Sequence, residues 1–228
     1  MRKPSYIILT LIVIILFTMA CTVTLPTDID LRPIRGSGDV IEETRPVSGF
    51  DTVILKGIGN IYVEQGASEA LRIEAEDNLI EHMEIEVIGD RLEIGFKNLI
   101  NIRSTRPINF YVTMVEIQSI QLLGSGNIQT GALVGEEIQL VLAGSGNITM
   151  DDVQAEILRT DLPGSGNIRV SGAVHRQEVR LLGSGDYDGQ DLRSAEADIS
   201  IAGSGNVSLD VSERLDITIA GSGTVRYR

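Results

Sequence analysis

Large aromatic side chains are nearly absent from this sequence. It contains no tryptophan, and tyrosine and phenylalanine together account for 4% of its 228 residues. We therefore expect a core filled mainly by aliphatic side chains, while the 24 glycines indicate a chain that turns often. Both features are atypical of helical bundles, and the length fits one globular or elongated domain.

Cysteine, histidine and basic residues are also scarce. The single cysteine excludes a disulfide framework, and we interpret the two histidines, His82 and His175, as ordinary exposed residues, which leaves little material for a zinc site or a histidine-based triad. Nineteen Lys and Arg residues against 32 Asp and Glu residues give a net charge of −13. This acidic field repels phosphate backbones, so we expect no nucleic acid partner, and no cofactor is indicated.

The first 20 residues have the pattern of an export signal. Two basic residues precede an apolar run over residues 5–20, which is shorter than the roughly 20 residues that a spanning helix needs. Cys21 follows directly, where a bacterial lipoprotein signal places the cysteine that becomes lipidated, although Thr18 and Met19 stand where leucine and a small residue are usual. Lipidation of Cys21, ordinary cleavage just before it and an uncleaved anchor are all open, and each exports the rest of the chain.

A short linker is predicted between this segment and the folded domain. Residues 21–35 are mostly polar, contain two prolines and show no sustained periodicity, so we interpret them as a tether. Residues 36–228 then form one extracytoplasmic domain, held at the cell envelope by the N-terminal lipid or anchor.

The tripeptide Gly-Ser-Gly dominates that domain. It occurs six times, at intervals of 20, 20, 19, 20 and 18 residues. A fixed period near 20 is typical of a solenoid, in which each repeat buries its apolar face against its neighbours. Short runs of alternating or β-branched apolar residues flank each copy, and the signature of leucine-rich repeats is absent. The sequence thus predicts an all-β fold, a parallel β-helix or β-solenoid.

Each copy of the tripeptide is expected to form a corner at the same height of successive coils. Glycine takes positive φ without a Cβ clash and lets neighbouring coils approach closely. The serines, and likewise the residues after the second glycine, would stack about 4.8 Å apart, and stacked Asn side chains hydrogen-bond between coils. We interpret the row as architectural, with a flat polar surface for a ligand such as a glycan as the alternative. The corner residues are Gly124, Ser125, Gly126, Asn127, Gly144, Ser145, Gly146, Asn147, Gly164, Ser165, Gly166, Asn167, Gly183, Ser184, Gly185, Asp186, Gly203, Ser204, Gly205, Asn206, Gly221, Ser222, Gly223 and Thr224.

Together these motifs resemble the bacterial family of autotransporter adhesin head GIN domains. The resemblance runs from Gly36 to Arg228 and includes Gly36-Ser-Gly-Asp-Val, Gly57-Ile-Gly-Asn-Ile-Tyr-Val, Gly89-Asp-Arg-Leu-Glu-Ile and the later repeats. It implies a right-handed β-helix on the outside of bacteria, often behind a lipoprotein signal. It implies no established activity, because "adhesin" is itself a label given by analogy.

Several segments depart from the regular pattern. Residues 50–115 are expected to form less regular coils that cap one end, with one helical turn beginning at Asp77 or Asn78. The pair Leu162-Pro163 interrupts a strand and predicts a bulge or an exposed edge. Arg226 and Arg228 place charge on the last edge, which discourages uncontrolled stacking, although a partner or a self-associating end stays open.

Acidic and aromatic side chains supply the remaining candidate sites. Asp186, Asp188 and Asp191 form the densest acidic cluster in a turn, but their spacing fits neither an EF-hand nor a calcium-binding nonapeptide, so they are only a weak metal candidate, and Asp151-Asp152 is weaker still. Other carboxylates alternate with apolar residues and are assigned to the wet faces of strands. These are Glu74, Glu76, Glu84, Glu86 and Glu93. Four tyrosines are predicted to pack at the rim of the solenoid, with stacking against a sugar as the alternative, namely Tyr62, Tyr111, Tyr187 and Tyr227.

Three functions follow from these features. The first is a non-catalytic adhesin-like module of the cell envelope that binds a glycan or another surface protein. The second is a purely structural or self-associating scaffold. The third is a carbohydrate-active enzyme, which would require paired carboxylates in a cleft and, usually, aromatic sugar platforms. The sequence shows no such convergence of carboxylates and contains no tryptophan.

Overall fold

The computed structural model describes residues 33–97 and 101–228, and these residues contain seventeen strands and one short helix. The expected export signal, Cys21 and most of the expected tether lie outside the described residues. The first strands and the helix are β1 (Ile34–Arg35), β2 (Val40–Arg45), β3 (Thr52–Lys56), β4 (Asn60–Gln65), β5 (Ala70–Glu76), α2 (Asp77–Ile80), β6 (Met83–Ile88), β7 (Arg91–Phe96), β8 (Ile102–Arg103) and β9 (Asn109–Met114). The repeat region holds β10 (Ser119–Leu122), β11 (Asn127–Thr130), β12 (Leu133–Leu142), β13 (Asn147–Leu162), β14 (Asn167–Leu181), β15 (Tyr187–Ile201), β16 (Asn206–Ile219) and β17 (Thr224–Tyr227).

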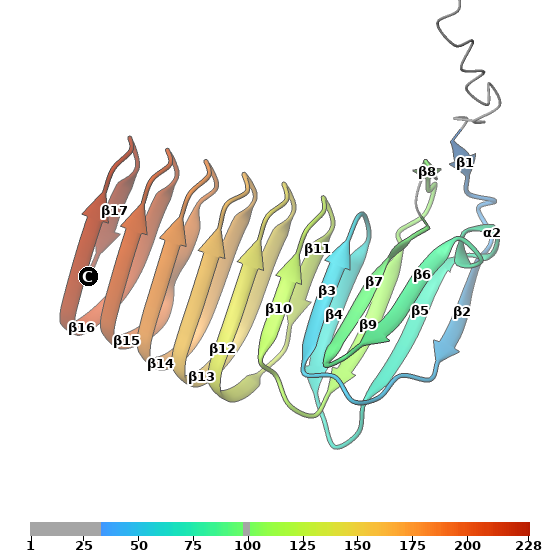
Figure 1. Cartoon of the computed structure of the whole chain (residues 1–228), viewed down its shortest axis with the longest axis horizontal. Helices are drawn as coiled ribbons and strands as arrows, with labels where there is room; N and C mark the ends of the chain where they lie inside the picture. The colour runs from blue at the N-terminus through green and yellow to red at the C-terminus, as the bar shows by residue number, and fades with distance from the viewer. Residues whose placement is uncertain (1–32, 98–100) are drawn as a thin grey trace, which may run out of the picture. The chain divides into compact units, whose positions relative to one another are not determined.

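The repeat region is a parallel β-solenoid, as the period predicted (Figure 1). Each coil pairs in parallel with the next, so that Asn127 lies beside Asn147 and Asn147 beside Asn167. The Gly-Ser-Gly corner divides each coil between two sheet faces. We call the face that follows the corner the Asn face, and the face that precedes it the opposite face. Because the sequence period equals one coil, equivalent side chains stack in rows along the solenoid.

The N-terminal coils follow a different strand order from the rest. Strands β3 and β4 pair on one side with β10 and β11, and on the other side with β7 and β9, which come later in the chain. Beyond them the pairing turns antiparallel, through β6 against β7 and through β5 against β9 and β2. Helix α2 begins at Asp77, as predicted, and buries Leu79 and Ile80 at this end. The end is therefore closed by antiparallel strands and a helical turn.

The start of the folded unit lies slightly earlier than residue 36. Ile34 and Arg35 form β1, which pairs in parallel with Ile102 and Arg103 of β8. The last three residues of the expected tether thus belong to the folded unit, which comprises residues 33–228. Among the described residues, no helix is long and apolar enough to cross a membrane.

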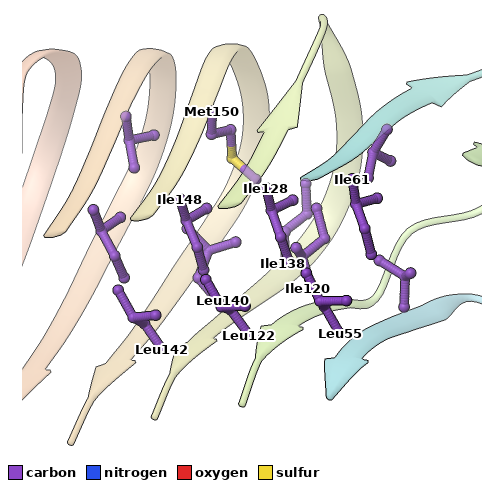
Figure 2. Packing of buried hydrophobic residues seen from close by; sticks show 14 of the residues in the cluster. Leu55, Ile61, Ile120, Leu122, Ile128, Ile138, Leu140, Leu142, Ile148 and Met150 are labelled. Atoms are coloured by element: carbon purple, nitrogen blue, oxygen red, sulfur yellow. The ribbon is translucent and has the colours of Figure 1, made fainter. Parts of the chain in front are cut away.

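The core is a set of aliphatic columns that run through successive coils. Figure 2 shows Ile61, Ile128 and Ile148 in one column and Leu122 and Leu142 in another, and all five are at most 1% exposed. Tyr187 follows Ile168 in the first column, because the two residues are register partners. The prediction of Tyr187 at the rim is therefore wrong. Its ring fits because Gly189 leaves space, where a Cβ would lie 2.8 Å from the ring.

A buried hydrogen-bond chain begins at the hydroxyl of Tyr187. The hydroxyl donates to Oε1 of Gln177 (3.2 Å), Nε2 of Gln177 donates to Oγ of Ser194 (2.7 Å), and that hydroxyl donates to the carbonyl of Asp210 (2.9 Å). Burial raises the pKa of Tyr187, so the phenol stays protonated as a donor.

We expect Tyr187→Phe to lower the free energy of unfolding by about 1–3 kcal/mol, because it leaves the buried Oε1 of Gln177 without its donor. Urea unfolding checks this value. Tyr62→Phe is the control, because the half-buried Tyr62 lies at the surface and the substitution keeps the ring that stacks on Tyr111. Equal stability of both variants would contradict a contribution from the buried chain.

The expected bulge at Leu162-Pro163 is also wrong. The pairing of β13 with β14 continues without a shift to Leu162 beside Leu181, and Pro163 follows in the corner. A proline there removes only one backbone hydrogen bond between coils. The next residue, Gly164, still donates to the carbonyl of Leu142, and Leu182 of the following coil still donates to the carbonyl of Leu162. The register shifts lie at the other edge of the coils, near Asp152, whose φ is 54°.

Candidate functional site

The Gly-Ser-Gly corners are tightly stacked backbone. An added Cβ on any of their twelve glycines would lie 1.6–2.2 Å from a glycine carbonyl oxygen of the neighbouring coil. None of these twelve glycines has positive φ, so the prediction of positive φ at the corners is wrong. In the equivalent N-terminal corner, Gly57 and Gly59 do have positive φ, of 133° and 115°. Close approach between coils, and not backbone conformation, explains why the repeated corners contain glycine.

The serines form an exposed ridge along these corners. Each serine N–H donates a hydrogen bond to the carbonyl oxygen of the first glycine in the preceding corner. The first of these bonds joins Ser125 to Gly57 (2.8 Å), and the last joins Ser222 to Gly203 (3.0 Å). Their side chains are exposed at every corner. The backbone rungs thus hold a regular row of hydroxyl groups at the surface.

A ladder of side-chain amides runs beside the serine ridge. Nδ2 of Asn127 donates to Oδ1 of Asn60 (3.1 Å), Asn147 donates to Asn127 (3.1 Å), and Asn167 donates to Asn147 (3.3 Å). On the N-terminal side, Nδ2 of Asn60 donates to Oδ1 of Asn109 (3.0 Å). The Gly-Ser-Gly period does not predict this extension of the ladder. All these bonds point in the same direction along the solenoid.

Asp186 interrupts the ladder because a carboxylate cannot donate. Its backbone N–H donates to Oδ1 of Asn167 (3.2 Å), replacing the missing amide, and its own Oδ1 accepts from the backbone N–H (2.8 Å) and Nδ2 (3.0 Å) of Asn206. The substitution thus keeps the coils connected while adding a negative charge to the row.

A shallow groove of about 640 Å³ lies beside the ladder on the Asn face. Its floor carries Thr149, Arg169, Asp188 and Ser208, which occupy one outward row of successive coils. Arg169 forms an ion pair with Asp188 at 2.7 Å, and the Arg169 side chain is 65% exposed. Amide, hydroxyl, guanidinium and carboxylate groups are therefore presented together, a set that can hydrogen-bond to a polar ligand.

A second, larger groove of about 880 Å³ lies on the opposite face of the coils, near β12. Its lining is acidic, since it includes Asp90, Glu116, Glu136 and Glu156 but only Arg91 as a cation. This groove disfavours anionic ligands.

Ion pairs connect neighbouring coils on the opposite face. Arg159 lies between Glu137, at 2.6 Å, and Glu178, while Arg176 contacts Glu178 at 3.2 Å. Arg214 of the last coil contacts Glu196 at 3.2 Å. The hydrogen bond with Glu137, together with nearby carboxylates, raises the pKa of Arg159. Much of the chain's acidic charge on this face is thus paired across coils.

The three aspartates of the weak metal candidate have separate partners. Asp186 belongs to the amide ladder, Asp188 pairs with Arg169, and Asp191 lies 3.9 Å from Arg228. Within residues 33–97 and 101–228, no group of three or more His, Cys, Asp or Glu side chains is arranged to hold a metal ion.

Among the remaining candidate residues, Asp152 and His175 line one shallow pocket over β13 and β14. Asp151 and Asp152 are exposed beside the register shift of β13, His175 is exposed on β14, and His82 is half-buried, 3.7 Å from Glu81. None of them adjoins the groove on the Asn face.

Two further tyrosines pack against each other at the N-terminal end of the Asn face. The rings of Tyr62 and Tyr111 stack with centroids 5.1 Å apart, and Arg72 lies 3.8 Å over the ring of Tyr111. The hydrogen bond to Glu74, with burial, raises the pKa of Tyr111. Both faces of Tyr111 are therefore covered, which does not favour it as a platform for sugar stacking.

Glu76 was assigned to a wet strand face, and this assignment is wrong. Its side chain is fully buried, and its carboxylate accepts hydrogen bonds from the N–H of Gly38 (2.8 Å), the N–H of Thr105 (2.9 Å) and the hydroxyl of Thr105. Burial alone would raise the pKa of Glu76, but these hydrogen bonds together hold it below its usual value. Glu76 thus connects two loops at the closed end.

Comparisons with known proteins agree with this architecture. The family model described as "Putative auto-transporter adhesin, head GIN domain" matches residues 49–228. No curated protein matches the sequence. A crystal structure of a "putative adhesin" from Bacteroides fragilis is similar over 86% of this chain and 100% of its own, with a TM-score of 0.78 and 18% identity.

Two structures from Parabacteroides distasonis have the same coverage. One is a "putative lipid binding protein" with a TM-score of 0.65 and 22% identity, and the other is a "putative adhesin" with a TM-score of 0.61 and 17% identity. At these identities the structures establish a shared fold. Because the family model matches residues 49–228, which are most of the chain, the protein belongs to the head GIN domain family.

Proposed function

We propose that the protein is exported, anchored by lipid at Cys21 in the cell envelope, and acts there as an adhesin-like module that binds a glycan. The observation that carries this proposal is the groove beside the amide ladder, where Arg169, Asp188 and Ser208 present donors and acceptors on a rigid sheet. A preformed polar surface of this kind suits the hydroxyl groups of a sugar.

Neither catalysis nor binding of an acyl chain is part of the proposal. The carboxylates of Asp186 and Asp188 are each engaged by a neighbouring donor, which disfavours them as a general acid and base. The name of one P. distasonis structure suggests a lipid ligand. The groove on the Asn face offers polar side chains instead, and the inward positions of the inner coils are filled by packed aliphatic side chains.

A glycan array probed with the full chain tests the ligand class. Ser208→Trp fills the groove on the Asn face and is expected to weaken binding at least about tenfold, which corresponds to 1.4 kcal/mol. Val134→Trp is the control, because Val134 is 59% exposed and lines the other groove. Absence of binding to any glycan, or loss of binding only in Val134→Trp, would contradict the proposal.

The anchor has its own test. A fatty-acid analogue fed to the producing bacterium is expected to label the wild-type chain and not Cys21→Ala, because Cys21 is the only cysteine to which a thioether-linked lipid can attach. Thr22→Ala is the matched control and should remain labelled. Equal labelling of Cys21→Ala would exclude this anchor, and the intact mass of the product would then distinguish simple cleavage from an uncleaved N-terminus.

A further inference from the structure

The last coil of the solenoid exposes side chains that other coils bury. Ile199 and Ile201 are 3% and 1% exposed, whereas their register partners Ile217 and Ile219 in β16 are 40% and 44% exposed. Likewise, Leu209 is 1% exposed and its partner Tyr227 in β17 is 66% exposed. These side chains are the last members of the core columns, so the core is open to solvent at this end.

Residues 210–219 of β16 pair only with β15, and β17 pairs only with β16, so both segments form an edge without a further strand partner among the described residues. They therefore present free backbone donors and acceptors beside the open columns, which is the arrangement that pairs with another strand. At the opposite end, β2 places Glu43 and Arg45 in line with the inward residues Ile73 and Leu71, and these two charges form an ion pair at 2.7 Å. An inward-pointing ion pair of this kind protects an edge against pairing.

We propose that the open end binds the open end of a second copy, forming a closed dimer with twofold symmetry. The rotation axis runs parallel to the strands, so that β16 of one copy lies antiparallel to β17 of the other, and the second contact repeats the first. Both open ends are then covered, and no free end is left to extend the assembly.

The side chains of the two strands match in this arrangement. When the last Gly-Ser-Gly corners of the two copies lie side by side, Ile219 faces Val225 of the partner and Ile217 faces the partner's Tyr227. These contacts continue the apolar columns of the core. On the outer surface, Asp216 faces Arg228 of the partner subunit, and Thr218 faces the partner's Arg226. Opposite charges on facing strands are favourable, and inward-facing apolar pairs exclude water.

The two alternative assemblies match less well. A twofold axis perpendicular to the sheets would place β17 against itself, with Arg226 and Arg228 of the two copies facing each other, which is unfavourable. Stacking of the open end on the closed end of another copy would bury the Glu43 and Arg45 ion pair against Val225 and Tyr227, and the desolvation of two charges opposes this contact.

Light scattering of the full chain in a mild non-ionic detergent, with the micelle mass subtracted, tests the proposal over a wide range of concentration. We expect a dimer. Ile219→Lys should raise the dissociation constant at least about tenfold. Ile41→Lys is the matched control, because Ile41 is 45% exposed at the closed end and should leave the dimer intact. A chain that is monomeric at every concentration, or a dimer that Ile219→Lys does not weaken, would overturn the proposal.

Substitutions at Thr218 test the relative orientation of the two copies. Thr218→Asp should strengthen the dimer and Thr218→Arg should weaken it, each by about three- to tenfold, because the partner's Arg226 faces this position. The double variant Thr218→Arg with Arg226→Asp should restore the wild-type affinity. A general loss of stability cannot produce opposite signs at one position. The reverse order, in which Thr218→Arg strengthens the dimer, would overturn the antiparallel pairing of β16 with β17.

Discussion

Gly166→Ala is expected to lower the free energy of unfolding by at least about 3 kcal/mol, because it overpacks a corner that has no space for a side chain. The new Cβ would lie 1.8 Å from the carbonyl oxygen of Gly146 and 3.1 Å from Cδ2 of Leu142. The two backbones can separate only by breaking the rungs from Ser165 and Gly166 to Gly144. Urea unfolding of the full chain, followed by circular dichroism, measures the loss.

Two control substitutions separate close approach from backbone conformation. Gly131→Ala meets no atom within 4 Å and has no positive φ, so its stability should stay within about 0.5 kcal/mol of wild type. Gly89→Ala also meets open space but has φ of 66°, so it should cost about 1–2 kcal/mol. Stability of Gly166→Ala equal to that of Gly131→Ala would contradict the crowded corner.

The repeated coils were predictable because their contacts are local in the repeat. Residues one period apart are neighbours in space, so Asn127 and Asn147 could be assigned to one row from their spacing alone. The same alignment carried the signal for Tyr187, which stands two residues after Gly185, in the place that Ile168 takes after Gly166. That position is inward in every coil, and the small residue Gly189 supplies the space.

The N-terminal coils could not be derived in this way. Strands β3 and β4 lie between strands that occur later in the chain, and this order leaves no period in the sequence. One partial signal is Gly57-Ile-Gly-Asn60, which forms an equivalent corner and places Asn60 in the ladder. The pairing of Asn60 with Asn109 spans 49 residues and depends on tertiary contacts that one sequence does not reveal.

The polar groove was anticipated only as a possible surface of stacked amides and hydroxyls. Its floor of Thr149, Arg169, Asp188 and Ser208 follows from the outward alternation of each strand, once the register is known. The open end was partly anticipated from Arg226 and Arg228. The exposure of Ile217 and Ile219 required the structure, because the sequence of β16 resembles that of the buried strands before it.

The alternation of β5 predicts Glu76 on the solvent side with Glu74, and the turn that follows explains why this prediction is wrong. Strand β5 ends at Glu76 and α2 begins at Asp77, so the chain turns there and the carboxylate enters the space between two loops. A cradle of N–H and hydroxyl donors then replaces water around it. Such a residue has no signature in the pattern of apolar positions, because its role depends on segments 38 and 29 residues away.

Glu76→Gln is accordingly expected to lower the free energy of unfolding by about 3 kcal/mol at neutral pH, because several hydrogen bonds to a buried charge are weakened together. The exchange rates of the Gly38 and Thr105 amide protons should rise with it. Glu84→Gln is the matched control, since Glu84 is exposed on β6 and should leave both quantities unchanged.

The stability gained from this carboxylate should also depend on pH. Because the folded state lowers the pKa of Glu76 below its ordinary value of 4.5, the unfolded chain takes up the proton first as the solution is acidified. The contribution is therefore fully present above pH 4.5 and is lost as the pH falls through the lower pKa of the folded state. Urea unfolding at a series of pH values should show the difference between wild type and Glu76→Gln shrinking in acid. A difference that stays constant from neutral to acidic pH would show that the ionised form of Glu76 does not stabilise the closed end.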